Sequence, residues 1–213
     1  MKKQKKSEKH LKILAIGDLH GDVTQAKKLA EKAVKENVDL VILAGDLTFT
    51  DKSIDYLVGP FAKRKLNVFF VPGNHENIAT ANFLEKMYKP YAENLHGKGK
   101  KLKGIGFFGG GGATVGPFFM SEQEIFEAIN DGFKKIKDAR KKVMISHSHP
   151  AGTLMAKLSI PIIKGSKAVR KAIEKFQPDL AICSHVHEAE GIEEKIGKTK
   201  VINVGRKGKI IEI

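Results

Sequence analysis

The sequence predicts an α/β fold, in which helices cover the faces of a β-sheet. Apolar runs of strand length alternate along the chain with segments whose apolar residues recur at helical spacing. The segment from Gly191 to Ile213 instead reads as two or three short strands joined by glycine-containing turns. Alternation of this kind is typical of a largely parallel sheet, and the closing strands are expected to add antiparallel pairs.

Six apolar runs are expected to be strands, because each is short and bounded by polar or glycine residues. They are Lys12–Ile16, Leu40–Ala44, Asn67–Val71, Gly104–Phe108, Val143–Ser146 and Asp179–Ser184. The glycine run Gly109–Gly112 follows the fourth strand and is predicted to lie outside any element, because glycine is too flexible for an element interior. A loop beside a substrate and a plain surface connection both fit that position.

Five segments of helical period separate most of these strands. They are Asp22–Glu36, Asp51–Lys65, Asn77–Met87, Ser121–Lys137 and Ser166–Phe176. Ser121 and Glu124 predict a capping box at the start of the fourth helix. Ser166 is the expected N-cap of the fifth. The alternative for that segment is that the preceding Lys164 and the helix amides lie near a phosphate.

The 213 residues suffice for one domain with a substantial core. We expect residues 1–9 to be a disordered basic tail and residues 10–213 a single domain, because no linker or second compositional regime follows the tail. No apolar run approaches the roughly 20 residues that span a bilayer, and no signal peptide is recognisable. The single cysteine, Cys183, fits a reducing compartment. We therefore predict a cytoplasmic protein with no membrane contact, and leave its oligomeric state open, a homodimer included.

The net charge of +14 is distributed over the tail and the body, since residues 2–9 contain five Lys and one Glu. A basic body favours anionic partners such as phosphorylated metabolites or nucleic acid. The alternative is that lysines merely solvate the helix faces. No aromatic or Arg-rich stripe accompanies the lysines, which favours this second interpretation. Nucleic acid is therefore a partner that the composition permits without requiring it.

Metal-competent side chains follow directly after five of the expected strands. The strings are ILAIGDLHGD, LVILAGDLT, VFFVPGNHE, KVMISHSHP and LAICSHVHE. Ligands of open α/β sheets bind beyond the carboxyl ends of the strands. We therefore expect a single polar cluster formed by Asp18, His20, Asp46, Asn74, His75, His147, His185 and His187.

This cluster predicts a centre of two metal ions, because it offers too many groups for one. Mixed carboxylate and imidazole ligands suit Mn²⁺, Fe, Zn²⁺, Ni²⁺ or Co²⁺ better than Ca²⁺ or Mg²⁺, and no tetrahedral thiolate pattern is present. Two carboxylates leave two divalent ions with net positive charge, which can hold a bridging hydroxide and an anionic substrate. Metal pairs about 3.5–4 Å apart stabilise the attacking and leaving oxygens of phosphoryl displacement.

The order and spacing of these strings along residues 12 to about 205 resemble the calcineurin-like metallophosphoesterase superfamily, and within it the small Icc-related phosphoesterases. The resemblance implies a four-layer α/β/β/α sandwich of two mixed β-sheets flanked by helices. It also implies a phosphoric ester hydrolase with two divalent metal ions, of which we expect Mn²⁺ first. Its substrate would be a small phosphorylated compound or a nucleotide.

The resemblance also implies a role for each residue of the cluster. One metal would be held by Asp18, His20 and His187. The other would be held by Asn74, His147 and His185. Asp46 would bridge the two ions. His75 would not be a ligand but would contact the substrate together with Asn74, and would protonate the leaving oxygen while a metal-bridging hydroxide attacks.

Three positions depart from the family pattern. Ser184 stands where the family usually has Gly before the final His-x-His, and being small it is expected to preserve the turn. Asp46 is followed by Leu-Thr-Phe-Thr rather than the Asp-Arg of protein Ser/Thr phosphatases, which argues against that activity. His149 stands where many relatives have Pro and competes with His147 as the ligand. The resemblance favours His147.

Hydrolysis of phosphodiesters is the leading hypothesis, because an alkoxide leaving group needs a proton donor such as His75. Hydrolysis of phosphomonoesters remains open within the same family. A nuclease acting on DNA or RNA is the alternative that the basic charge suggests. A non-catalytic scaffold of the same fold is disfavoured, because every expected ligand and His75 are present.

Overall fold

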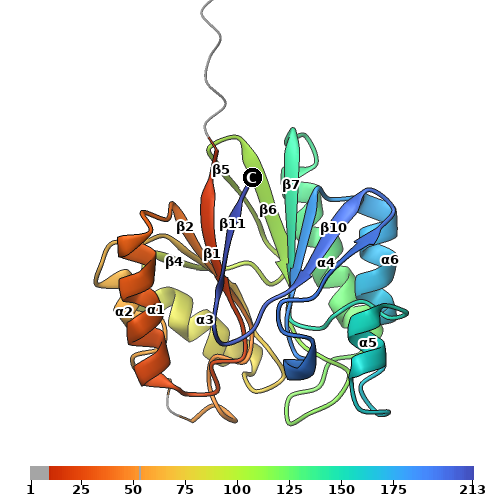
Figure 1. Cartoon of the computed structure of the whole chain (residues 1–213), viewed down its shortest axis with the longest axis horizontal. Coiled ribbons are helices and arrows are strands. Elements are labelled where there is room, and N and C mark those ends of the chain that lie inside the picture. The colour runs from red at the N-terminus through yellow and green to blue at the C-terminus, as the bar shows by residue number, and fades with distance from the viewer. Residues whose placement is uncertain (1–9, 53) are drawn as a thin grey trace, which may run out of the picture.

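The protein folds into two β-sheets packed face to face, each covered on its outer side by helices (Figure 1). The computed structural model describes residues 10–52 and 54–213, so the expected basic tail lies outside the described residues. The layers follow the order α/β/β/α, which confirms the predicted sandwich. Within the described part of the chain, no helix is long and apolar enough to cross a bilayer.

The first sheet has the strand order β11-β1-β2-β3-β4. β1, β2, β3 and β4 run parallel, and β11 pairs antiparallel with β1. Its strands are β1 (Lys12–Ile16), β2 (Leu40–Ala44), β3 (Val68–Val71), β4 (Ala92–Asn94) and β11 (Lys209–Glu212). Its outer face is covered by α1 (Val23–Lys35), α2 (Gly59–Ala62) and α3 (Ile78–Met87).

The second sheet has the strand order β5-β6-β7-β8-β10-β9, with antiparallel pairs only at its two edges. Its strands are β5 (Gly99–Leu102), β6 (Ile105–Gly110), β7 (Lys141–Ser146), β8 (Leu180–Cys183), β9 (Glu193–Ile196) and β10 (Thr199–Asn203). Helices α4 (Glu122–Ile136) and α6 (Lys167–Phe176) cover it. Two short helical segments, α5 (Leu154–Leu158) and η1 (His187–Ala189), lie at the end that holds the metal-competent residues.

Three apolar clusters hold the four layers together, and β1 contributes to two of them. Leu14 and Ile16 pack toward the helices of the first sheet, whereas Ile13 and Ala15 pack between the two sheets. Each fully buried aliphatic side chain of this size stabilises the fold by about 1.5–3 kcal/mol. Burial on both faces explains why the strands read as continuous apolar runs rather than as alternating ones.

Side chains cap the helix starts, as predicted for α4 and α6. Asp22 accepts a hydrogen bond from the Gln25 amide at 2.9 Å and begins α1. Ser121 and Glu124 form the expected capping box of α4. Such caps satisfy backbone amides that have no partner within the helix.

The predicted helix over Asp51–Lys65 was wrong in extent, because α2 contains only Gly59–Ala62. Pro60 stands in the first turn of α2 and cannot occupy a helix interior. Before it, Asp51 and Tyr56 have positive φ, which interrupts any helix there. The sequence analysis also missed the short elements β4, β5 and α5, whose three to five residues are too few to display a period.

The prediction for the glycine run was wrong for its first half, since Gly109 and Gly110 are the buried end of β6, whereas Gly111 and Gly112 lie outside any element as expected. A Cβ atom at Gly109 would lie 2.4 Å from the Ile145 carbonyl oxygen. One at Gly111 would lie 2.1 Å from the Pro72 carbonyl oxygen. These positions therefore require glycine for close backbone approach rather than for flexibility. The run packs β6 against the loop that carries Asn74.

Candidate metal centre

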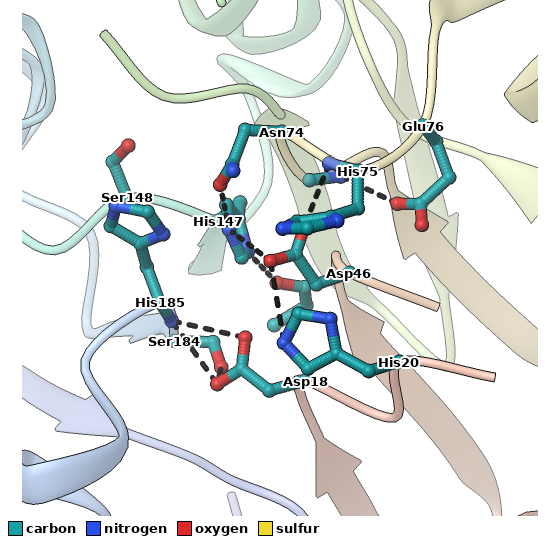
Figure 2. Close-up of polar contacts among 12 residues, drawn as sticks. Asp18, His20, Asp46, Asn74, His75, Glu76, His147, Ser148, Ser184 and His185 are labelled. Carbon is teal, nitrogen blue, oxygen red and sulfur yellow. Dashed lines mark hydrogen bonds and ion pairs between the residues drawn. The ribbon is translucent and has the colours of Figure 1, made fainter. Parts of the chain in front are cut away.

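The expected cluster forms where strands of both sheets end, in the seam between the sheets (Figure 2). The sequence had predicted a cluster at the edge of one sheet. Instead, β1, β2 and β3 of the first sheet and β7 and β8 of the second all contribute. The structure brings together every residue that the sequence analysis selected: Asp18, His20, Asp46, Asn74, His75, His147, His185 and His187.

Four of these residues adopt a left-handed backbone conformation. The φ angles are 54° at Asp18, 46° at His20, 51° at Asp46 and 77° at His185. Such angles are uncommon outside glycine and cost of order 1–3 kcal/mol each. They are held in place by cross-loop hydrogen bonds, such as those from the Asp18 amide to the Gly45 carbonyl and from the His20 amide to the Asp46 carbonyl. Strain of this kind concentrates at functional sites.

Asp46 lies at the middle of the cluster and is 2% exposed. Its Oδ2 atom is 3.3 Å from His147 Nε2 and 3.7 Å from His20 Nε2. Its Oδ1 atom accepts a hydrogen bond from the His75 amide at 3.0 Å. One carboxylate oxygen therefore faces imidazoles from both sheets.

On one side of Asp46 lie Asp18, His20 and His187. The Nε2 atoms of the two histidines are only 3.3 Å apart, and His187 Nε2 is 3.9 Å from Asp18 Oδ2. Two imidazole nitrogens at this distance can share an N–H···N hydrogen bond or can bind the same cation. With the Asp18 carboxylate beside them, they form one place at which a cation could bind.

On the other side lie Asn74, His147 and His185. His147 Nδ1 is 2.9 Å from the Ala44 carbonyl, to which it donates, and this leaves Nε2 directed into the cluster. Nε2 is 3.0 Å from Asn74 Oδ1, and the His185 ring lies 4.8 Å from the His147 ring. Backbone bonds of this kind fix the orientation of metal-binding histidines.

The electrostatics of the metal-free cluster show which groups can bind a cation. Burial lowers the pKa of His20 to about 4 and that of His185 to about 3, so both are neutral at pH 7. Burial also acts to lower the pKa of His147, but the Asp46 carboxylate overrides it and raises that pKa to about 9. Although burial opposes it, His147 in turn lowers the pKa of Asp46. A proton on His147 thus occupies a position that a metal cation could take.

The donor set fits divalent cations. Three groups have all their ligand atoms within 4.8 Å of one another: Asp18/His20/His187, His20/Asp46/His75 and Asp46/His147/His185. Ligand atoms that surround one ion at about 2.1 Å lie about 3–4 Å apart, which is the range of the separations above. Buried nitrogens of His20 and His75 have no hydrogen-bond partner among the described residues. The chain therefore carries candidate Asp and His ligands for divalent metals.

His75 lies at the rim of the cluster. Its ring stacks on the exposed Phe49 with centroids 5.2 Å apart and meets the His20 ring edge-on at 4.8 Å. Because His75 also belongs to one of the three possible ligand groups, its position alone is compatible with a ligand or with a proton donor. His149 belongs to none of these groups, whereas its competitor His147 does.

The sequence analysis missed two groups that hold the cluster in place. Ser184 was treated only as a small replacement for glycine, but its hydroxyl lies within hydrogen-bond reach of the Asp18 carboxylate and of the Val204 carbonyl. Glu76 was given no role, but it is 1% exposed and joins the two loops that carry Asp46 and Asn74. It accepts hydrogen bonds from the Thr48 amide at 2.6 Å and the Gly73 amide at 2.9 Å. The sequence could have indicated a role for Glu76, because this glutamate directly follows the predicted site residues Asn74 and His75.

Glu76 should make the metal-free protein less stable as the pH rises. Burial, reinforced by the Asp46 carboxylate, raises the pKa of Glu76 from 4.5 to about 7. Its contribution is therefore fully present below about pH 4.5 and lost as the pH passes through about 7, on the order of 3 kcal/mol. The difference in unfolding free energy between the wild type and Glu76→Gln, measured by urea unfolding, should therefore shrink across this range. A difference that does not change with pH would refute the assignment.

Comparisons with known proteins agree with this geometry. The family model of calcineurin-like phosphoesterases matches residues 11–189. An uncharacterised protein of Methanocaldococcus jannaschii is 31% identical over 205 residues, which cover 92% of this chain and 88% of that protein.

Solved structures share the fold at lower identity. The structure of TT1561 of Thermus thermophilus superposes with a TM-score of 0.74 at 18% identity and covers 95% of this chain and 98% of that one. A structure described as a novel archaeal phosphodiesterase superposes with a TM-score of 0.55 at 16% identity, covering 95% and 100%. With two packed sheets, strand-end Asp and His residues and a family match over most of its length, the chain belongs to the calcineurin-like phosphoesterase family.

Proposed function

We propose that this phosphoric ester hydrolase is a phosphodiesterase that works with two divalent metal ions. One observation carries the proposal: the same Asp46 oxygen lies 3.3 Å from His147 and 3.7 Å from His20, which belong to different candidate ligand groups. A carboxylate can bind two cations at once, whereas a neutral imidazole offers one lone pair. Asp46 is therefore the proposed bridging ligand.

The remaining ligands divide on either side of Asp46. Asp18, His20 and His187 would hold one ion. Asn74, His147 and His185 would hold the other. Their mixture of carboxylate, amide and imidazole groups favours Mn²⁺, with Fe, Zn²⁺, Ni²⁺ or Co²⁺ as alternatives. When bound, the metal pair would lower the pKa of a water molecule and neutralise charge on the phosphoryl group.

His75 and Asn74 are proposed to contact the substrate. The His75 ring lies at the rim, supported by Phe49 on one face, where it can reach an oxygen outside the ligand cluster. Its role is to donate a proton to the leaving alkoxide, so that an ester without a good leaving group can be cleaved. The proposed substrates are small phosphodiesters of the nucleotide type.

The structure offers less support for a nuclease. The lysines of β5 and its flanks are each paired with a carboxylate: Lys98 with Glu85, Lys100 with Glu93, Lys101 with Asp138 and Lys103 with Asp39. Pairing reduces the positive field that a nucleic acid would meet. A steep salt dependence of DNA binding would favour the nuclease instead.

The proposed function is tested by titrating metal-stripped protein with Mn²⁺ in the presence of a chromogenic phosphodiester or the corresponding monoester. Saturable, Mn²⁺-dependent hydrolysis of the diester, with two metal ions bound per chain, is the expected result. Hydrolysis of the monoester alone would redirect the assignment to phosphorylated metabolites. Inactivity on both esters with two metals bound would favour a scaffold.

Ser184→Ala should weaken metal binding without removing a ligand. The Ser184 hydroxyl is next to the Asp18 carboxylate. Burial raises the pKa of Asp18, although His147 and the Ser184 hydroxyl both act to lower it. Loss of a group that orients a ligand typically costs about 10- to 100-fold in metal affinity. We expect a Mn²⁺ affinity about tenfold lower by isothermal titration calorimetry. Ser148→Ala is the matched control, because that hydroxyl bonds the Gly112 carbonyl instead. Unchanged affinity in Ser184→Ala would exclude the orienting role.

A further inference from the structure

A narrow pocket lies beside the ligand cluster and is not explained by metal binding. It is lined by Thr114, Ser148, His149, Lys164, Ser166 and His185, among others. Its accessible volume of about 10 Å³ admits a single water-sized group such as a phosphate oxygen and is too small for a ring. A larger cavity of about 180 Å³, which includes Ile160 and His187, shares Ile163 and His185 with the narrow pocket.

His149 gives the narrow pocket an unused hydrogen-bonding group. The side chain is 0% exposed, yet neither ring nitrogen has a partner among the described residues. Its ring stacks on His185 with centroids 6.2 Å apart, which places it one ring away from the cluster. In either neutral tautomer the ring offers one N–H donor and one acceptor. Buried polar groups without partners are rare and often functional.

Lys164 gives the pocket a positive charge. Its side chain is exposed, and within residues 10–52 and 54–213 it forms no ion pair. No Asp or Glu is among the described residues that line the pocket. The nearby start of α6 is already satisfied, because Ser166 caps it and Glu122 accepts from the Lys167 and Ala168 amides. His149 and Lys164, together with the exposed residue Thr114 on the pocket wall, are therefore groups that can donate to a ligand.

We propose that this pocket binds a second oxyanion of the substrate, a phosphate or carboxylate carried beyond the scissile ester, through His149 and Lys164. This rests on the proposed phosphodiesterase function for its link to the substrate. An anionic oxygen would accept from the His149 N–H and the Lys164 ammonium, and charge-assisted bonds of this kind are the stronger ones. The larger cavity can receive the carbon skeleton between the two anionic groups. The substrate class is thus a phosphodiester with an additional phosphate or carboxylate.

Binding is tested first without metals or turnover. Inorganic phosphate is titrated into the metal-stripped full chain, and the ring resonances of His149, identified by their loss in His149→Leu, are followed by NMR. We expect a saturable shift and an affinity about tenfold lower in Lys164→Ala. Lys171→Ala is the matched control, because Lys171 is also an exposed lysine but does not line the pocket. It should bind phosphate like the wild type. Absence of any saturable shift at His149 would overturn the proposal, and Lys164→Ala keeps the test valid if His149→Leu fails to fold.

A second experiment distinguishes the substrate from free phosphate as the source of the oxyanion. The Mn²⁺-loaded protein is given thymidine 5′-(p-nitrophenyl phosphate) with or without a 3′-phosphate. Lys164→Ala and His149→Leu should raise KM about tenfold for the compound with the second phosphate and leave the other within about twofold. Equal effects on both compounds would overturn the assignment to the substrate and leave free phosphate as the ligand. If the wild type hydrolyses neither compound, the proposed function fails, and the phosphate titration alone decides whether the pocket binds an oxyanion.

Discussion

Asp46→Asn should lower kcat/KM for a chromogenic phosphodiester by about 10³-fold, equivalent to about 4 kcal/mol of transition-state stabilisation. Asparagine preserves the shape of the side chain and can still accept from the His75 amide, which Asp46 does at 3.0 Å. It removes the negative charge that faces His20 and His147. The two proposed metal ions would then share no anionic ligand, and we expect metal analysis to find fewer than two ions per chain.

The metal-free variant gives an independent readout of the same contact. Because the Asp46 carboxylate raises the pKa of His147 to about 9, its removal should lower that pKa, and NMR titration of the His147 ring would measure the change. Asp22→Asn is the matched control, since Asp22 caps α1 near the cluster and bonds Gln25 and Arg206 rather than any candidate ligand. It should retain wild-type activity within a few-fold. A fully active Asp46→Asn enzyme with two bound metals would refute the bridging role.

His75→Ala should leave the metal content intact and lower kcat by about 10²–10³-fold for diesters with alkoxide leaving groups. The reason is that an alkoxide must be protonated as it departs, whereas p-nitrophenolate leaves without a proton. The loss should therefore be small for the p-nitrophenyl ester. Steady-state kinetics on the two esters, together with metal analysis, measure both effects.

Two outcomes would change the role of His75. Loss of metal in His75→Ala would make it a ligand, which its membership of a ligand group with His20 and Asp46 allows geometrically. Equal losses on both esters would indicate that His75 positions the substrate rather than donating a proton. His10→Ala is the matched control, because His10 is exposed and precedes β1, at the opposite end of that strand from Asp18.

The catalytic assignments and the pocket at His149 make separable predictions. Asp46 and His75 act on the scissile ester. Replacing Asp46 should therefore affect every substrate, and replacing His75 should affect every ester with an alkoxide leaving group. His149 and Lys164 line a neighbouring pocket, so their replacement should affect only substrates with a second oxyanion. The ratio of kcat/KM values for paired substrates therefore distinguishes a damaged metal centre from a damaged pocket.

Local patterns in the sequence predicted the central strands of both sheets and most helices, but not the short strands β4 and β5. The strands that build the sheet interiors are apolar on both faces, and this burial explains why their runs stand out. Capping residues such as Ser121 and Ser166 act within one turn of the chain, so their roles could also be predicted. The expected helix over Asp51–Lys65 failed because Pro60 restricts it and the preceding turns carry positive φ.

The sequence by itself determined which side chains meet, because Asp, His and Asn follow the ends of neighbouring strands in a regular order. Only the tertiary structure decided how they meet. Packing of the two sheets places Asp46 between His20, in the loop after β1, and His147, which directly follows β7 and lies far away in the chain. Contacts of this range depend on the seam between the sheets and leave no period in the sequence. The same seam turned the glycine run into a close-packed strand end, and the loops after β7 and before α6 enclosed His149 beside His185.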